Sequence, residues 1–192
     1  VMAYFYRMTA DTNLEDFVRP GEQIRQIAFA CQTSSFQFID HKPMTVEIAE
    51  DGGLTFPDFL YNDGVPLISR SFKRILDAQG VDNLFYKPID LVDAATGLHE
   101  EYTLALPPRI RAVREAYMRL LDEDGDESEG KELIKDEYGI ALYRINASAV
   151  GNYRIFKLAD VWDYDIIVTE GLMEAITKAS LHNVFFSEVE ED

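Results

Sequence analysis

Two stretches of this chain repeat one pattern at a separation of 100 positions, and this pair constrains the fold more than any other feature. Residues 67–86 read LISRSFKRILDAQGVDNLFY, and residues 167–186 read IVTEGLMEAITKASLHNVFF; they align without a gap. Each begins with a short apolar run, continues with apolar residues at the spacing of an amphipathic helix, and ends in an aromatic segment. The pattern therefore predicts a strand, a helix and a strand, twice.

The residues at the expected helix ends support this prediction. Ser69 and Thr169 stand immediately before the helical spacing and have the side-chain oxygen that an N-cap requires. Gly80 follows the first helix and can adopt the left-handed conformation that ends a helix. Because the matching positions are apolar residues or caps, we expect the two units to build the core and not to perform chemistry.

The rest of the chain predicts a single domain over residues 1–192 with an α+β or α/β fold around a mixed β-sheet. Its expected parts are a β-rich N-terminal part (1–55), the first strand–helix–strand unit (56–90), an acidic loop (122–130) and the second unit (156–189). Further strands are expected at residues 4–8, 24–30, 36–40, 45–49, 100–108, 138–145 and 153–158. A helix is expected after Pro108, because Ile110, Val113 and Tyr117 have helical spacing.

Charge limits the partners of this chain. Its 35 acidic and 18 basic residues give a formal net charge of −17, which repels nucleic acid and anionic membranes. The same charge suits a basic protein partner, although solubility alone explains it equally well. No apolar run approaches the ~20 residues that cross a bilayer, and the single cysteine, Cys31, fits a reducing compartment. We therefore expect a cytoplasmic protein that binds neither nucleic acid nor membrane.

The acidic loop matches a calcium-binding loop only in part. Asp122, Asp124 and Asp126 have the spacing of the first three ligands. However, Glu127 stands where that loop needs glycine, and Leu133 stands where it needs a bidentate glutamate. The pattern therefore favours a solvated charge run over a metal site.

No other motif predicts catalysis or a cofactor. His41, His99 and His182 are far apart in the sequence and form no metal-ligand motif. Cys31 without a paired motif is typical of a small buried hydrophobe. We expect no catalytic residue, no metal and no cofactor, so an enzyme with an unfamiliar site ranks behind the two classes of binding protein considered next.

Two groups of segments resemble a known family. They are IFKL (155–158) with IIVTEGLMEAI (166–176), and DFL, PLISRSFKRIL and DNLFYKPI between residues 58 and 89. Together they resemble, over residues 56–192, a family of immunity proteins from bacterial polymorphic toxin systems. The resemblance implies a non-enzymatic inhibitor that binds and neutralises a cognate toxin. It transfers no binding residue, because the shared motifs are structural.

The expected binding residues therefore come from charge and aromaticity alone. The acidic loop would meet a basic toxin, and two aromatic residues in VWDYD (161–165) would act as anchors. The candidates are Asp122, Glu123, Asp124, Asp126, Glu127, Glu129, Trp162 and Tyr164. The alternative interpretation is a regulatory domain without catalytic activity that binds a protein or a small ligand.

Overall fold

The computed structural model describes residues 4–13, 15–113, 118–121, 130–135, 141–159 and 165–189, and these form an α+β fold. The first sheet has the order β2-β5-β6-β4-β3. Its strands are β2 (Met44–Glu47), β3 (Phe59–Asn62), β4 (Val65–Ile68), β5 (Phe85–Val92) and β6 (His99–Leu106). The second sheet has the order β13-β1-β12-β11-β7. Its strands are β1 (Phe5–Thr9), β7 (Arg109–Ile110), β11 (Ile155–Leu158), β12 (Ile166–Thr169) and β13 (Phe185–Val189). Each sheet is mixed, since one of its pairs is parallel.

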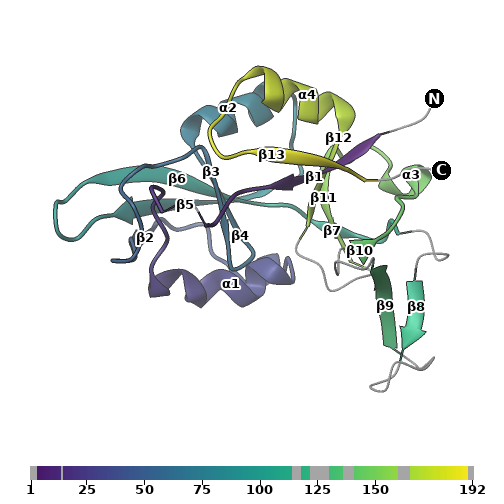
Figure 1. The fold of residues 1–192 in the computed structure, drawn as a ribbon, viewed down its shortest axis with the longest axis horizontal. Coiled ribbons are helices and arrows are strands. Elements are labelled where there is room, and N and C mark those ends of the chain that lie inside the picture. The colour runs from purple at the N-terminus through teal and green to yellow at the C-terminus, as the bar shows by residue number, and fades with distance from the viewer. Residues whose placement is uncertain are drawn as a thin grey trace.

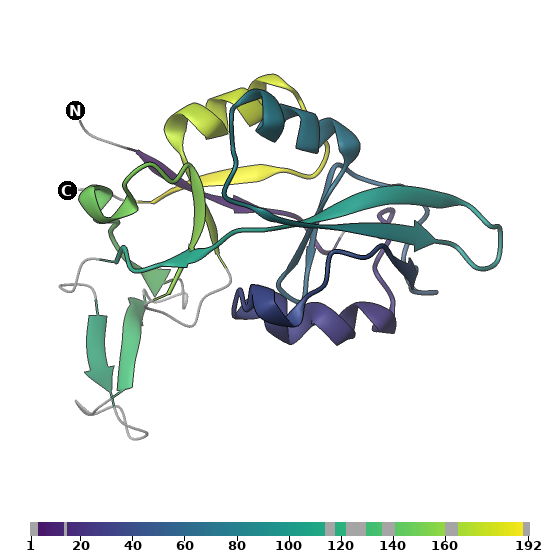
Figure 2. The same ribbon diagram turned by 180° about the vertical axis from the view of Figure 1, so that it is seen from behind.

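A smaller antiparallel sheet and the helices complete the described elements. The small sheet contains β8 (Met118–Leu121), β9 (Gly130–Lys135) and β10 (Ala141–Leu142). The helices are α1 (Arg25–Gln32), α2 (Arg70–Ala78), α3 (Ala147–Val150) and α4 (Glu170–Lys178), with 3₁₀ helices η1 (Glu22–Ile24) and η2 (Phe36–Phe38). Helices α2 and α4 lie side by side on one side of the molecule, and α1 lies on the opposite side (Figure 1). In the view from behind, the β5–β6 hairpin extends beyond the helices (Figure 2). No helix in the described ranges is both long and apolar enough to cross a bilayer.

The two main sheets have the same internal arrangement. In the first, β6 lies between β4 and β5; in the second, β1 lies between β12 and β13. The registers agree as well. Phe85 faces Leu106 where Phe185 faces Thr9, and Ile68 faces Thr103 where Val168 faces Tyr6. The N-terminal strand therefore takes, in the second sheet, the place that β6 takes in the first.

Three buried clusters form the core. Helices α2 and α4 cover a cluster shared by both sheets, in which Phe72 and Leu172 are fully buried. A second cluster lies between α1 and the first sheet, and a third lies on the second sheet around Phe156. Lys157, on β11, is fully buried and donates to the carbonyls of Cys31 (3.0 Å) and Gln32 (3.3 Å) at the end of α1. A cation at the last carbonyls of a helix is favourable, so this contact joins α1 to the second sheet.

Local predictions around α2 are confirmed. The hydroxyl of Ser69 accepts a hydrogen bond from the backbone N–H of Phe72 at 3.1 Å, which is an N-cap contact. Gly80 has φ +68°, as the end of a helix requires. Thr169 differs: it occupies the N-cap position of α4, but its side chain accepts no hydrogen bond within the described first turn.

Three local predictions are wrong. Residues 24–30 were expected to form a strand, but α1 begins at Arg25, and the expected strand at 36–40 is instead the 3₁₀ helix η2. The described part of residues 1–55 thus contains one α-helix and two 3₁₀ helices beside β1 and β2. The helix expected after Pro108 is replaced by β7, which pairs with β11 and is followed by a bridge from Val113 to Ile145. Pairing with a distant strand overrides the helical spacing there.

Candidate protein-binding site

Helix α1 carries a large exposed aromatic side chain opposite its buried face. Ile24, Ile27, Ala28 and Cys31 follow the i, i+3, i+4, i+7 spacing and are buried against the first sheet. Phe29 lies off this stripe and is 71% exposed. The packing of α1 thus fixes the helix while leaving Phe29 on the surface.

A tight turn after α1 places a second aromatic segment beside the helix. Ser35 donates its backbone N–H to the carbonyl of Ala30 at 2.8 Å, and the hydroxyl of Ser34 donates to the carbonyl of Pro107 at 2.8 Å. Phe36, in η2, then stacks on Phe85 of β5 with ring centroids 5.7 Å apart and rings nearly parallel. Phe38, two residues later, is 73% exposed.

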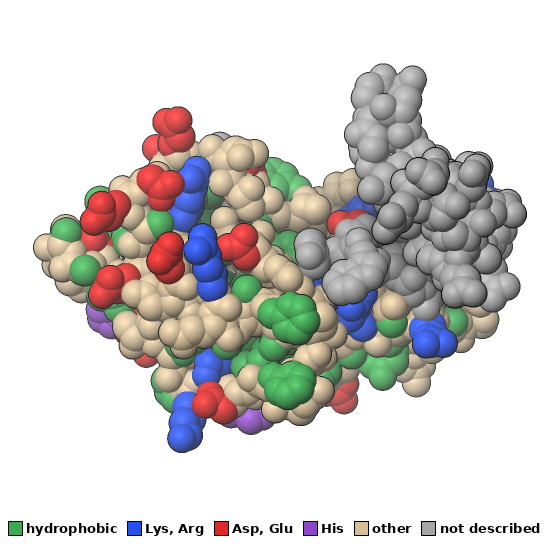
Figure 3. Space-filling model, turned by 90° about the horizontal axis from the view of Figure 1, so that it is seen from below, with side chains coloured by type: hydrophobic (Ala, Val, Ile, Leu, Met, Phe, Trp, Pro, Cys, Tyr) green, Lys and Arg blue, Asp and Glu red, His purple; other side chains and the backbone are tan. Residues whose placement is uncertain are grey.

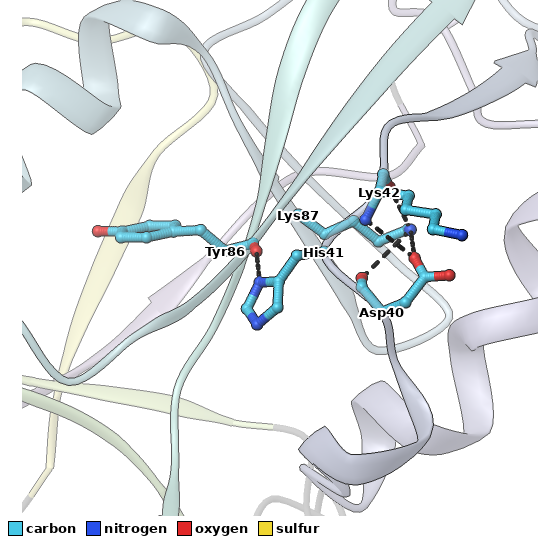
Figure 4. A network of polar contacts seen from close by, with 5 residues as sticks. All are labelled: Asp40, His41, Lys42, Tyr86 and Lys87. Atoms are coloured by element: carbon cyan, nitrogen blue, oxygen red, sulfur yellow. Dashed lines mark hydrogen bonds and ion pairs between the residues drawn. The ribbon is translucent and has the colours of Figure 1, made fainter.

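A buried lysine holds the next part of the chain against β5 (Figure 4). Lys87 donates from Nζ to Oδ1 of Asp40 at 2.6 Å, to the carbonyl of Asp40 at 3.3 Å and to the carbonyl of Lys42. An ammonium group has three donors, and three acceptors satisfy them. Lys87 is therefore a structural anchor, and we assign it no reactive role.

The same network sets the electrostatics of Asp40. The hydrogen bond from Lys87, assisted by one from the backbone N–H of Lys42 at 3.0 Å, lowers the pKa of the Asp40 carboxyl. Both bonds stabilise the ionised form. Asp40 therefore stays an acceptor that closes the turn, and it has no proton to give in a general-acid role.

His41 completes the stack on Phe85. Its ring lies over that of Phe85 with centroids 4.4 Å apart. Its Nδ1 is 3.0 Å from the carbonyl oxygen of Tyr86, a contact drawn in Figure 4. The polar contact fixes the ring in place. His41 therefore forms part of the aromatic stack between η2 and β5.

We call the set Phe29, Phe36, Phe38, His41 and Phe85 the aromatic corner. The face that carries α1 shows hydrophobic side chains at the surface, with charged side chains around them (Figure 3). Phe29 and Phe38 are the two most exposed large hydrophobic residues of the described chain. Exposed aromatic side chains on a fixed frame, bordered by charge, are typical of protein-binding surfaces.

A groove beside α2 is a concave feature of the described chain. It has a volume of about 430 Å³ and lies between α2, β2, β5 and β6. Its charges are already paired: Arg70 contacts Glu101 at 2.8 Å, and Lys73 contacts Asp77 at 2.8 Å. The volume is in the range of small-molecule sites, but paired charges leave few groups to orient a ligand.

The residues predicted from charge and aromaticity cannot be compared with this surface. Asp122, Glu123, Asp124, Asp126, Glu127, Glu129, Trp162 and Tyr164 all lie outside the described residues. Within the described ranges, no three His, Cys, Asp or Glu side chains are grouped as a metal site would need. Burial raises the pKa of the Cys31 thiol to about 12, despite the nearby Lys157 ammonium.

Sequence reasoning missed Phe29 and Phe38, although a signal was present. The buried stripe of α1 is readable at helical spacing, and Phe29 is the large apolar residue that does not fit it. A scan against protein-family models and a search of curated proteins find no match to this chain. The aromatic corner therefore provides the main evidence for function.

Proposed function

We propose that this protein works by binding another protein through the aromatic corner, and that the partner is a bacterial toxin which it neutralises in the cytoplasm. The exposure of Phe29 and Phe38 supports a protein-binding role. The resemblance of residues 56–192 to immunity proteins of polymorphic toxin systems supports the toxin as partner. In this proposal the protein blocks the toxin by contact and performs no reaction.

The aromatic corner has the features that make an interface strong. Burying one exposed phenylalanine side chain contributes about 1.5–3 kcal/mol, and aromatic residues are frequent among those that dominate binding. The turn that carries Phe38 is fixed by the Phe36–Phe85 stack and by the three contacts of Lys87. A surface that is already ordered loses little conformational entropy on binding.

Charge would add speed and selectivity to this contact. The described residues contain 21 of the 35 acidic residues and 17 of the 18 basic ones, so most of the excess negative charge lies in the remaining segments. A basic toxin would be attracted by this field, which raises association rates at low salt. The six acidic candidates between Asp122 and Glu129, with Trp162 and Tyr164, remain part of the proposal for this reason.

The test combines capture with toxicity. The wild-type protein is used as bait in a lysate of its native host, at low salt and at about 0.5 M salt, where surface charges are strongly screened. Each captured protein is then expressed alone and together with the bait. We expect one that stops growth when expressed alone and is harmless when the wild-type bait is present.

Variants locate the binding site. The double variant Phe29→Ala/Phe38→Ala should lose protection and weaken binding by about 100-fold or more, because hot-spot truncations each cost about 2 kcal/mol. The matched control Leu98→Ala/Tyr153→Ala also removes two exposed hydrophobic side chains and should keep both. If no captured protein is both toxic and relieved by the bait, the toxin proposal is wrong; equal binding by both double variants would remove the aromatic corner from the site.

The groove beside α2 supports the alternative, a regulatory domain that binds a small ligand. Its volume of about 430 Å³ is the specific observation in favour. A ligand screen by thermal shift tests it, because a ligand at 100 times its Kd stabilises the folded state by about 2.7 kcal/mol. Arg70→Ala should abolish a shift caused by binding in this groove.

A further inference from the structure

Strand β13 forms an open edge of the second sheet. It pairs with β1 on one side, from Phe185 opposite Thr9 to Val189 opposite Phe5. On its other side, no hydrogen bond from the described chain reaches the backbone of β13. Phe185 is 53% exposed at the start of this edge. An edge strand of this kind presents a row of unpaired N–H and C=O groups.

The corresponding edge of the first sheet is covered. Strand β5 occupies there the position that β13 occupies in the second sheet, and β2 pairs with it in parallel from Met44 opposite Ile89 to Glu47 opposite Val92. Just before β2, the ring of His41 contacts the carbonyl oxygen of Tyr86 on the same edge. The molecule itself thus shows that an extended segment fits the outer edge of this sheet arrangement.

Acidic side chains lie on β13 and on the helix that covers the same sheet. Glu188 lies on β13, and Glu170 and Glu174 lie on α4, which is packed near β1. Burial and the charges of these three carboxylates raise the pKa of Tyr6, which faces Glu188 across the β1–β13 pair. The positions that match Glu170 and Glu174 in the first unit are Arg70 and Arg74, so the charge of the two helices is reversed.

We infer that the outer edge of β13 binds an extended basic segment of a partner protein, which adds to the second sheet as a further strand. Main-chain hydrogen bonds to an open edge supply affinity in this mode of recognition, and side chains supply specificity. Lysine or arginine residues of the segment would pair with Glu170, Glu174 and Glu188. The inference is independent of the function proposed above, because it concerns a different face and requires no toxin.

The charges near β13 disfavour a second copy of this chain as the strand that pairs with its open edge. Pairing of two β13 strands would bring Glu188 of each copy, and the α4 glutamates beside it, toward the same carboxylates of the other copy. Like charges across a strand pair are destabilising. The protein is therefore expected to be monomeric at 100 µM by light scattering, and a dimer that disappears with Phe185→Lys would overturn the inference.

The binding test uses capped eight-residue peptides of alternating residues. The probe alternates lysine and valine, and the control alternates glutamate and valine. Amide hydrogen exchange of the full chain is measured with each peptide at 1 mM and low salt. We expect the lysine peptide to slow exchange in β13 and the glutamate peptide to leave it unchanged. No protection of β13 by the lysine peptide would overturn the inference.

Two variants separate edge pairing from general attraction to an acidic protein. The triple variant Glu170→Gln/Glu174→Gln/Glu188→Gln should bind the lysine peptide about tenfold more weakly and with less salt dependence, because exposed ion pairs each contribute little. The matched control Glu22→Gln/Glu50→Gln/Glu100→Gln removes three exposed carboxylates elsewhere and should bind as the wild type does. Equal weakening by both triple variants would overturn the inference.

Discussion

Asn183 makes the contacts that are most informative to remove. It is one of the buried polar residues of the core, 7% exposed, in the turn between α4 and β13. Its Oδ1 accepts from the backbone N–H of Asp11 at 2.9 Å, and its Nδ2 donates to the carbonyls of Asp11 at 3.2 Å and Phe59 at 2.9 Å. One side chain thus joins β13, the segment after β1 and the start of β3 in the other sheet.

The expected loss for Asn183→Ala follows from these contacts. Each hydrogen bond contributes about 1 kcal/mol net, so three contribute about 3 kcal/mol. Asn183 also has φ +64°, where alanine is strained by about 1 kcal/mol more than asparagine. Asn183→Ala should therefore lower the free energy of unfolding by about 4 kcal/mol, and Asn183→Gly, which removes the strain, by about 3 kcal/mol.

Asn83 provides the matched comparison. It stands 100 positions earlier, and its Nδ2 donates one hydrogen bond, to the carbonyl of Ile155 at 2.9 Å. Asn83→Ala should lower the free energy of unfolding by about 1 kcal/mol. The assay is urea unfolding followed by far-ultraviolet circular dichroism, with equal slopes for the three variants and the wild type as the condition for comparison.

The critical result is the loss in free energy of unfolding caused by Asn183→Ala compared with the loss caused by Asn83→Ala. If Asn183→Ala lowers the free energy of unfolding by no more than Asn83→Ala, the three contacts of Asn183 do not hold the two sheets together. If both Asn183→Ala and Asn183→Gly lower the free energy of unfolding by about 4 kcal/mol, the result would agree with a contribution from the hydrogen bonds. It would refute the contribution from backbone strain, because glycine would recover no stability.

Two further predictions concern a turn and a thiol. Ser180 has φ +53° at the position where the first unit has Gly80 with φ +68°, so Ser180→Gly should raise the free energy of unfolding by about 0.5–1 kcal/mol; thermal melting checks this, and a lower melting temperature would contradict it. Because burial raises the pKa of Cys31 to about 12, roughly one thiol in 10⁴ is ionised at pH 8. Ellman's reagent should leave the native protein unmodified at pH 8 and react within minutes in guanidinium chloride, whereas rapid reaction of the native protein would show that the thiol is accessible.

Sequence signals predicted the structure correctly where that structure depends on contacts between neighbouring residues. The segment from β4 to β5 was predicted with its cap, helix and terminating glycine, because Ser69 and Gly80 act on neighbours within four residues. The same reasoning failed for α1. Residues 24–30 are a short segment of mixed apolar and polar residues, and such a segment was interpreted as a strand although its buried residues have helical spacing.

The candidate site could be predicted only in part. An acidic, aromatic chain without a catalytic motif favoured a binding protein, and charge and aromaticity pointed to the acidic loop with Trp162 and Tyr164, not to Phe29 and Phe38. The exposure of Phe29 and Phe38 follows from which face of α1 packs on the first sheet and from where Phe85 places η2. The spacing along α1 indicates that Phe29 lies off its buried face, but the contact of Phe36 with Phe85, which places η2, joins distant segments and is not indicated by any spacing.

The sequence by itself determined the two strand–helix–strand segments, the α+β class and the net charge, since periodicity, capping and composition act over short distances. Only the tertiary structure decided that β1 completes the second sheet as β6 completes the first, and that β5 has a covered edge while β13 has an open one. The reason is physical: strand pairing joins backbone groups that are alike in every residue, so the choice of partner depends on how the whole chain packs.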